Sequence, residues 1–223
     1  MTVTDGNVVK SAIFERPDDA NKGTLGSLLC VCGSYGMAGA AVMSAKGALR
    51  TGIGLAKCAL PRSIYPIVAQ TILESVYYPL SENADGRISK VNVPFLVSES
   101  CKSSATLVGC GLGVCDDTLK IVFSLIENST TPLVLDADAL NCVAKQPEIL
   151  LRKKAPIIIT PHPGEMSRLT GLATPLVNAE RERVALDFAQ KYGVVTVLKG
   201  AGTVIASPNG KVLVNPTGNS GMA

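Results

Sequence analysis

The sequence contains a single histidine, His162, in the segment Thr-Pro-His-Pro-Gly-Glu that ends at Glu165. Two prolines hold the histidine in an extended turn, and the glutamate follows where a helix is expected to begin. A carboxylate there could complement the positive end of the helix dipole, or it could lie in the outer shell of a bound metal ion. We interpret His162 as a candidate functional residue and leave both roles of Glu165 open.

Two aspartates, Asp136 and Asp138, directly follow the apolar run 133–135. A carboxylate at the end of a buried strand can hold a ligand hydroxyl or a hydrated magnesium ion. The alternative role is to cap the next helix. We favour a functional role for Asp136 and the capping role for Asp138.

Two glycine-rich segments could bind phosphate groups. Gly33, Gly36 and Gly39 precede an expected helix, whose first N–H groups attract anions. The segment Lys199–Thr203 contains two glycines and a lysine, which suits a phosphate or an adenine ribose. Both segments could instead be tight turns, and the glycine-rich Gly109–Gly113 is not the dinucleotide fingerprint. A Walker-type phosphate loop is absent from the sequence.

Short apolar runs alternate along the chain with segments of helical periodicity, which is typical of a parallel sheet. Asp116 and Asn178 are predicted to cap two of the helices, the segment 92–101 is undecided, and residues 1–26 are expected to form a polar leader that covers the core. The sequence predicts strands at 28–32, 54–60, 74–78, 105–108, 133–135, 157–159 and 194–198, helices at 40–51, 64–70, 116–127 and 178–192, and a hairpin of 203–206 and 211–214.

We therefore predict one α/β domain over residues 1–223, with a mostly parallel central sheet covered by helices on both faces. Ligands of such sheets bind beyond the carboxyl ends of the strands. The candidate residues all follow expected strands, so they should gather at one edge of the sheet.

Composition excludes several classes of function. The 21 Lys and Arg against 18 Asp and Glu leave a scattered net charge of +3, which gives no support for binding nucleic acid or a membrane surface. The apolar runs are too short to span a bilayer, and no signal peptide precedes them. The seven cysteines, an odd number, are expected to be buried reduced thiols in a cytoplasmic protein.

Together these segments resemble the ADP/ATP-dependent NAD(P)H-hydrate dehydratase family, a branch of the ribokinase-like fold. The resemblance extends from Lys22 to Ala223. Its matching segments are Lys22–Gly26, Gly33–Ala41, Arg50–Gly54, Gly109–Gly113, Leu135–Asn141, Thr160–Glu165, Leu198–Thr203 and Asn215–Asn219.

The resemblance implies a ribokinase-like repair enzyme that restores NADH or NADPH from its hydrate (NADHX or NADPHX). The hydroxyl of the S form is phosphorylated by ADP or ATP with Mg²⁺, and loss of phosphate regenerates the cofactor. It further implies a homo-oligomer, often a tetramer, that works together with an NAD(P)H-hydrate epimerase. Transferred by position, the hydrate would contact Ala40, Gly111 and His162, Glu165 would lie near magnesium, and the nucleotide would bind Lys199, Gly200, Ala201, Gly202 and Thr203. We add Asp136 to the expected hydrate contacts and Asn215 to the expected nucleotide contacts.

The sequence departs from the family pattern in two places. Cys110 stands where the family usually has proline, which is a mild change. The sequence stops at Gly221-Met222-Ala223, before the family's Gly-Thr/Ser-Gly-Asp turn with its catalytic aspartate. The catalytic residue is therefore unknown. We expect a piece of a longer product with an incomplete site and one bared apolar face of the sheet; a short form completed by another chain is the alternative.

Two other functions remain open at this point. One is a small-molecule kinase of the same fold that acts on a thiazole, pyrimidine or pyridoxal substrate. The other is a nucleotide-binding remnant without catalytic activity. The choice between ADP and ATP is also open, because both would use the same loop.

Overall fold

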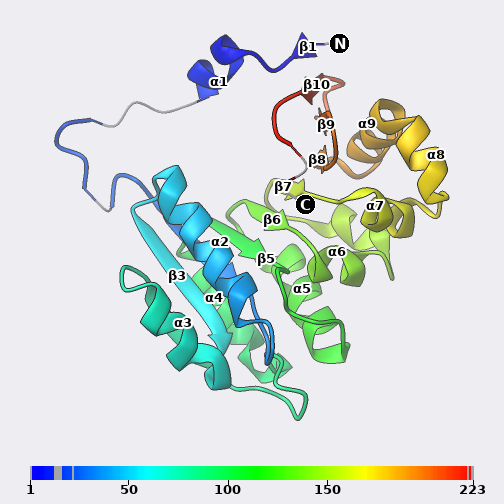
Figure 1. Cartoon of the computed structure of the whole chain (residues 1–223). Coiled ribbons are helices and arrows are strands. Elements are labelled where there is room, and N and C mark those ends of the chain that lie inside the picture. Colours follow the sequence, from blue (N-terminus) through cyan, green and yellow to red (C-terminus); the bar gives the residue numbers. More distant parts are fainter. Residues whose placement is uncertain (1, 13–16, 22, 220, 222–223) are drawn as a thin grey trace.

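The computed structural model describes residues 2–12, 17–21, 23–219 and 221. Their strands form a single ten-stranded sheet with the order β1-β10-β9-β8-β7-β6-β5-β2-β3-β4 (Figure 1). The strands are β1 (Thr2–Val3), β2 (Ser27–Val31), β3 (Leu55–Pro61), β4 (Val76–Leu80), β5 (Ala105–Val108), β6 (Leu133–Leu135), β7 (Ile157–Ile159), β8 (Val195–Leu198), β9 (Thr203–Ala206) and β10 (Val212–Asn215).

Helices connect most of the parallel strands, as crossover connections require. Short 3-10 helices at Arg62–Ile64, Lys90–Asn92 and Pro147–Arg152 supplement them. The α-helices are α1 (Gly6–Ala12), α2 (Ala38–Thr51), α3 (Tyr65–Thr71), α4 (Val93–Cys101), α5 (Asp116–Asn128), α6 (Asp138–Val143), α7 (Pro163–Thr170), α8 (Thr174–Ala179) and α9 (Arg181–Tyr192).

The strands β2 to β8 run parallel to one another, and the sheet changes direction only at one end. There β9 pairs antiparallel with both β8 and β10, while β1 adds parallel to β10. The carboxyl ends of β2, β5, β6, β7 and β8 therefore lie at the same edge as the start of β9 and the end of β10. This edge is called the carboxyl edge below.

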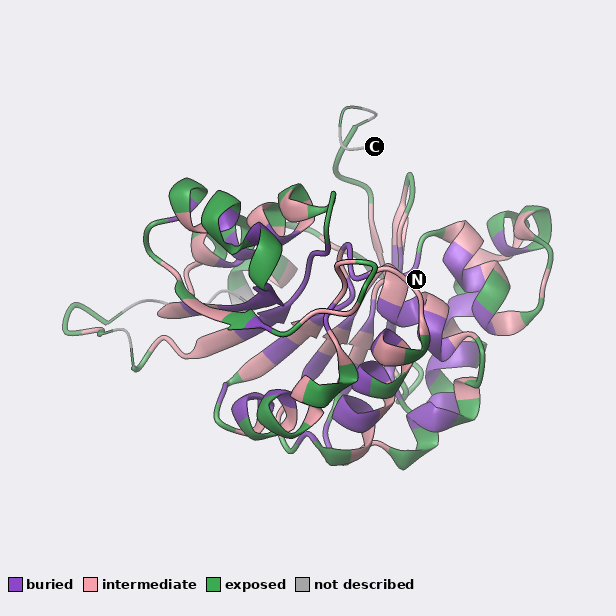
Figure 2. Cartoon of the chain, turned by 90° about the horizontal axis from the view of Figure 1, so that it is seen from below, coloured by how far each residue is buried: buried purple, intermediate pink, exposed green. Residues whose placement is uncertain are grey.

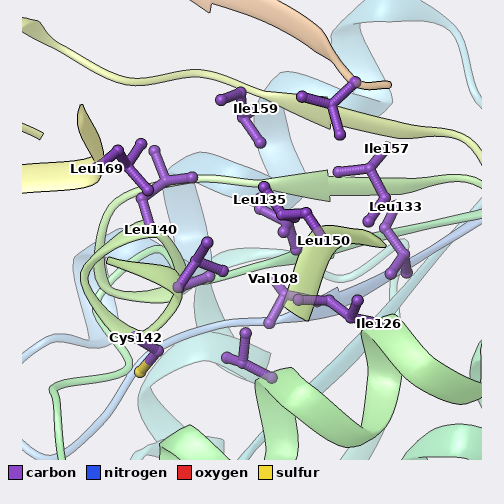
Figure 3. Close-up of a cluster of buried hydrophobic side chains, with 14 of the residues drawn as sticks. Val108, Ile126, Leu133, Leu135, Leu140, Cys142, Leu150, Ile157, Ile159 and Leu169 are labelled. Carbon is purple, nitrogen blue, oxygen red and sulfur yellow. The ribbon is translucent and has the colours of Figure 1, made fainter. Parts of the chain in front are cut away.

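Two apolar clusters cover opposite faces of the sheet, because alternate side chains of a strand point to opposite faces. Leu29 and Val31 belong to the larger cluster, which α4 to α9 cover, while Cys30 and Cys32 face α2 and α3. Part of the larger cluster is visible in Figure 3, where Leu135 and Ile159 lie near Leu140 and Leu169. The predicted α/β class, mostly parallel with helices on both faces, is confirmed.

The face that α2 and α3 cover is only partly shielded. Figure 2 shows their coils over one part of this face, whereas helices line the other face along its length. Val134, Ile158 and Val197 point away from the larger cluster and are only half-buried. Along β6, β7 and β8 this apolar face is thus partly exposed, whereas α2 and α3 cover another part of it.

Several local predictions were wrong. The helix expected at 178–192 is two helices, α8 and α9, with Asn178 inside the first and Glu180 as the N-cap of the second. Asp116 is the first residue of α5, and Cys115 is its N-cap. The expected leader contributes a strand of the sheet, since Thr4 N donates to Val214 O at 2.9 Å. The undecided segment 92–101 contains α4, with a proline in its first turn.

The cysteines and the helices can be compared with the expectations of free, buried thiols and of no membrane span. All seven cysteines are free; Cys30, Cys32, Cys58 and Cys142 are buried, whereas three others are half-buried. Among the described helices, none combines the length and apolar character needed to cross a membrane. Lys22, Met222 and Ala223, which belong to segments singled out above, lie outside the described residues.

Candidate functional site

The glycine-rich loops after β2 and β5 pack directly against each other. Gly33 N donates to Cys110 O at 2.8 Å, and Ser34 Oγ donates to Gly111 O at 2.7 Å. A Cβ on Gly111 would lie 2.7 Å from the Cβ of Ala40, and Gly111 has φ +69°. Ala40, in the first turn of α2, therefore lies beside Gly111, where the missing side chain lets the backbones approach closely.

A charged pair connects the ends of β6 and β8. Lys199 Nζ lies 2.7 Å from Asp136 Oδ1, and Thr160 Oγ1 donates to the same oxygen at 2.7 Å. Partial burial raises the pKa of the Asp136 carboxyl, but the hydrogen bonds from Lys199 and Thr160 outweigh it and hold that pKa below its usual range. Asp136 is therefore a carboxylate, and it fixes the direction of the lysine side chain.

His162 and Glu165 form a reciprocal cap at the start of α7. His162 Nδ1 accepts from Gly164 N at 3.0 Å and from Glu165 N at 3.4 Å, while Glu165 Oε2 accepts from His162 N at 2.8 Å. The side chain of His162 is 52% exposed and that of Glu165 only 6%. His162 Nε2 lies 3.5 Å from Glu165 Oε1. One ring nitrogen thus serves the helix, and the exposed ring is available to a ligand.

Lys199 also connects the cap to the rest of the site. Its Nζ lies 4.0 Å from Glu165 Oε2, and its backbone N donates to Pro161 O at 2.8 Å. Ala40 thus contacts Gly111, and the preceding residue Cys110 contacts Asp136. From Asp136 the contacts continue to Lys199, and from there to Glu165 and His162.

The segment Lys199–Thr203 joins β8 to β9 at the same edge. Gly200 and Gly202 have φ of +149° and +67°, which favours glycine at both positions. Thr203 Oγ1 donates to Gly200 O at 3.0 Å, and Asn215 is the register partner of Thr203 across the β9–β10 pair. A hollow of about 550 Å³ lies beside this segment, lined in part by Ala201, Gly202 and Arg181.

The backbone after β6 is strained and tightly packed. Ala137 is the one non-glycine residue with positive φ (+49°) in the part of the chain that the structure describes. A Cβ on Gly109 would lie 1.8 Å from Asp136 O. The prediction that Asp138 is the N-cap of α6 was wrong, because Ala137 takes that position. Asp138 Oδ2 instead accepts from Gly113 N at 2.8 Å. Strain of this kind persists where neighbouring contacts hold the backbone.

Cys110 interacts with both Cys32 and Asp136. Cys110 Sγ donates to Asp136 Oδ2 at 3.4 Å. A hydrogen bond with Cys32 lowers the pKa of Cys110, and the same contact together with burial raises the pKa of Cys32. The Cys110 side chain therefore adds a polar contact to the carboxylate.

The structure brings every predicted site residue to the carboxyl edge, although their binding roles remain predictions. Sequence reasoning assigned Asp136 to one ligand and Lys199 to another, and it missed their ion pair. It also missed Thr160 as a hydrogen-bond partner and Arg181 beneath the 199–203 segment. A lysine at the end of a strand was the available signal for the ion pair, whereas nothing in the spacing indicates Arg181.

The acidic residues of the site do not form a multidentate metal centre by themselves. Among the described residues, no group of three or more His, Cys, Asp or Glu side chains is arranged to hold a metal ion. Glu165 is a buried carboxylate that belongs to the cap of α7, and Lys199 neutralises Asp136. A metal at this edge would need further ligands, such as the phosphate oxygens of a nucleotide.

Comparison with known proteins gives a consistent result. The family model for NAD(P)H-hydrate dehydratase matches residues 28–223. A bifunctional NAD(P)H-hydrate repair enzyme of Thermofilum pendens is 40% identical over 208 residues, covering 93% of this chain but only 40% of the relative. An ADP-dependent (S)-NAD(P)H-hydrate dehydratase of Neisseria meningitidis is 33% identical over 211 residues, covering 93% of this chain and 67% of the relative.

A solved structure resembles the whole chain. The ADP/ATP-dependent NAD(P)H-hydrate dehydratase of Bacillus subtilis, co-crystallized with ATP/Mg²⁺, has a TM-score of 0.81 at 30% identity. The match covers 98% of this chain and 73% of that one. Likeness to solved ribokinase-like structures confirms the predicted fold family. The chain spans about 40% of the length of the bifunctional relatives that it matches.

Proposed function

The chain belongs to the NAD(P)H-hydrate dehydratase family, and from that membership we propose that it repairs hydrated NADH and NADPH. ADP or ATP would phosphorylate the hydroxyl of the S form. The hydroxyl oxygen attacks the terminal phosphorus and loses its proton, and the shortened nucleotide leaves. Loss of phosphate together with a neighbouring ring proton then restores the reduced nicotinamide. The family match across residues 28–223 carries this proposal.

The hydrate is assigned to the stretch from Ala40 to His162. Ala40 carries only a methyl group, so a flat ring can approach the first turn of α2, and Gly111 packs directly beside it. Asp136 is a carboxylate that can accept from a ligand hydroxyl, and the exposed ring of His162 can contact the nicotinamide side. These contacts would orient the substrate for phosphoryl transfer.

The nucleotide is assigned to residues 199–203 and to Asn215. The two glycines give this segment a backbone conformation that can curve around a phosphate, and Lys199, which pairs with Asp136, keeps a side chain that is 43% exposed. We place Mg²⁺ near Glu165, because magnesium is commonly held by one or two carboxylates together with substrate phosphates. Bound there, the ion would neutralise charge on the transferring phosphoryl group.

No base for the accepting hydroxyl is assigned. Asp136 receives hydrogen bonds from Lys199 and Thr160, and its lowered pKa makes it a weak proton acceptor. Asp138 is held by Gly113 N and belongs to the same strand end. The proposal therefore covers substrate and nucleotide binding by this chain and leaves proton removal to a group outside these residues.

The remaining partners follow from the same membership. We propose a cytoplasmic homo-oligomer, often tetrameric in form, that is functionally coupled to an NAD(P)H-hydrate epimerase. Seven free cysteines suit a reducing compartment, and bifunctional relatives suit a coupled repair system.

The test is a repair assay on the full-length gene product. NADH hydrate is incubated with Mg²⁺ and either ADP or ATP, and recovery of NADH is followed by its absorbance. We expect recovery that requires the nucleotide, with the more effective donor identified by comparing the two. Adding an epimerase should extend recovery to the R form. Absence of NADH recovery with both donors, from a folded protein that binds nucleotide, would contradict the proposal.

A further inference from the structure

Arg181, the first residue of α9, reaches from the helix to both ends of the 199–203 segment. Its Nη2 donates to Leu198 O at 2.8 Å and to Gly202 O at 3.5 Å. Leu198 is the last residue of β8, and Gly202 directly precedes β9. One guanidinium group therefore holds the carbonyl groups on either side of the loop, as its planar set of donors allows.

The middle of the loop is also fitted to this side chain. A Cβ on Gly200 would lie 2.9 Å from Nη1 and 2.9 Å from Nη2 of Arg181. The φ of Gly200 is +149°, in the range that favours glycine. The loop backbone is thus folded closely over the guanidinium plane, and both its glycine and its conformation depend on that contact.

The charge of Arg181 is not compensated by an acid. Within the described chain, no acidic oxygen lies within 4.0 Å of its guanidinium, and its buried Nε has no hydrogen-bond partner. Burial lowers the pKa of Arg181, which shows the cost of holding this charge away from water. Arg183, two residues along α9, is instead paired with Glu180 and Asp187.

A half-buried cation without an acid, under a glycine-rich loop, creates positive potential at the loop. Such a potential favours the binding of an anion at the loop. The hollow of about 550 Å³ beside the loop is lined by Arg181, Ala201 and Gly202, together with Arg183 and two glutamates. One of these, Glu180, is paired with Arg183, so a ligand there would meet Arg181 as the arginine without an acid partner.

We propose that Arg181 is the positioning residue of the nucleotide loop: it holds residues 199–203 in the conformation that binds the phosphates of an adenine nucleotide and supplies positive charge behind them. This inference rests on the proposed function for the identity of the anion. The conformational part, a loop held by the guanidinium, rests on the contacts alone.

The test compares Arg181→Ala and Arg181→Lys with Arg152→Ala, the loss of an exposed arginine that pairs with Glu127 and does not line the hollow. Binding of ADP and ATP is measured by calorimetry, and amide hydrogen exchange is measured across residues 199–203. We expect Arg181→Ala to weaken nucleotide binding about tenfold or more and to speed exchange in the loop. Arg181→Lys keeps the positive charge but loses the planar guanidinium with its several donors. This variant should bind nucleotide more tightly than Arg181→Ala and less tightly than the wild type. Arg152→Ala should match the wild type in both measurements.

Each outcome decides between the two proposals. Unchanged loop exchange in a folded Arg181→Ala variant, with unchanged nucleotide affinity, overturns this inference. A wild-type protein that binds no nucleotide contradicts the proposed function. Faster amide exchange in the loop of Arg181→Ala would still support the role of Arg181 in holding residues 199–203. If Arg181→Ala does not fold, Arg181→Lys takes its place. Wild-type nucleotide affinity and wild-type loop exchange in Arg181→Lys would then overturn the inference that the guanidinium positions the loop.

Discussion

Lys199 Nζ lies 2.7 Å from Asp136 Oδ1, which ties the end of β8 to the end of β6. The two strands are not neighbours, because β7 separates them in the sheet. Thr160, which follows β7, donates to the same carboxylate oxygen at 2.7 Å. Three strand ends therefore meet on one oxygen, and the nucleotide segment is joined to the residues assigned to the hydrate.

Replacing Lys199 with Ala should weaken binding of ADP or ATP by about 10- to 100-fold, because a charge-assisted contact is worth roughly 1.5–3 kcal/mol. The cost to folding should be under about 1 kcal/mol, since the Lys199 side chain is 43% exposed and its pair is screened by water. Calorimetry and urea unfolding measure the two effects. Lys211→Ala, an exposed lysine in the hairpin turn, is the control. Equal nucleotide affinity in both variants would contradict this role of Lys199.

Asp136 should make stability depend on pH in the acid range. Its pKa is lowered in the folded protein, so the carboxylate stabilises the fold above the usual aspartate pKa of about 4, and this contribution is lost as pH falls through the lowered value. Asp136→Asn should lower the free energy of unfolding at pH 7 and flatten its decline in acid. Urea unfolding between pH 7 and pH 3 tests this, with the exposed Asp187→Asn as control. An unchanged acid decline in Asp136→Asn would refute the assignment.

Gly109 should be intolerant of any side chain. A Cβ there would lie 1.8 Å from Asp136 O, and φ is +127°. Gly109→Ala is expected to lower the free energy of unfolding by more than about 3 kcal/mol, or to prevent soluble expression. Gly171→Ala is the matched control: its φ is +76° and the space around it is open, so only the backbone strain of about 1 kcal/mol applies. Similar losses in both variants would show that the close packing at Gly109 is unimportant.

The capping role of His162 and its proposed contact with the substrate can be separated by substitution. His162→Ala removes the cap of α7 and should cost about 1 kcal/mol of unfolding free energy, whereas His162→Asn should retain the cap. Neither variant keeps the imidazole, so both should weaken binding of the hydrate. Urea unfolding and the KM for NADH hydrate in the repair assay measure the two effects. A wild-type KM in His162→Asn would exclude the imidazole as a substrate contact.

The sheet was predictable because its strands are continuous apolar runs, which parallel strands buried on both faces require. The runs 133–135 and 157–159 were predicted with the bounds that β6 and β7 have. The break between α8 and α9 was not predictable from caps alone. Asn178 is a good capping residue, but Pro175 begins a separate helix before it, and Glu180 interrupts the helical backbone with φ −125° and ψ 39°.

The site was predictable as a set of strand ends but not as a set of contacts. Asp136 and Lys199 are 63 positions apart, and their contact depends on strand order, which the residue pattern leaves undetermined. Asp138 was assigned as a cap from its type, but the positive φ of Ala137 moved that function away from it. Arg181 was missed because its role depends on how α9 packs against β8 and β9.

The antiparallel joint between β8 and β9 constrains how the 199–203 segment can change. Thr203 is held opposite Asn215, and Leu198 opposite Val204. Inserting or deleting one residue in the segment would shift this alignment and turn every β9 side chain to the other side of the sheet. Substitutions in residues 199–203 can therefore change the chemistry of the loop, whereas the pairing of the following hairpin fixes the length of the loop.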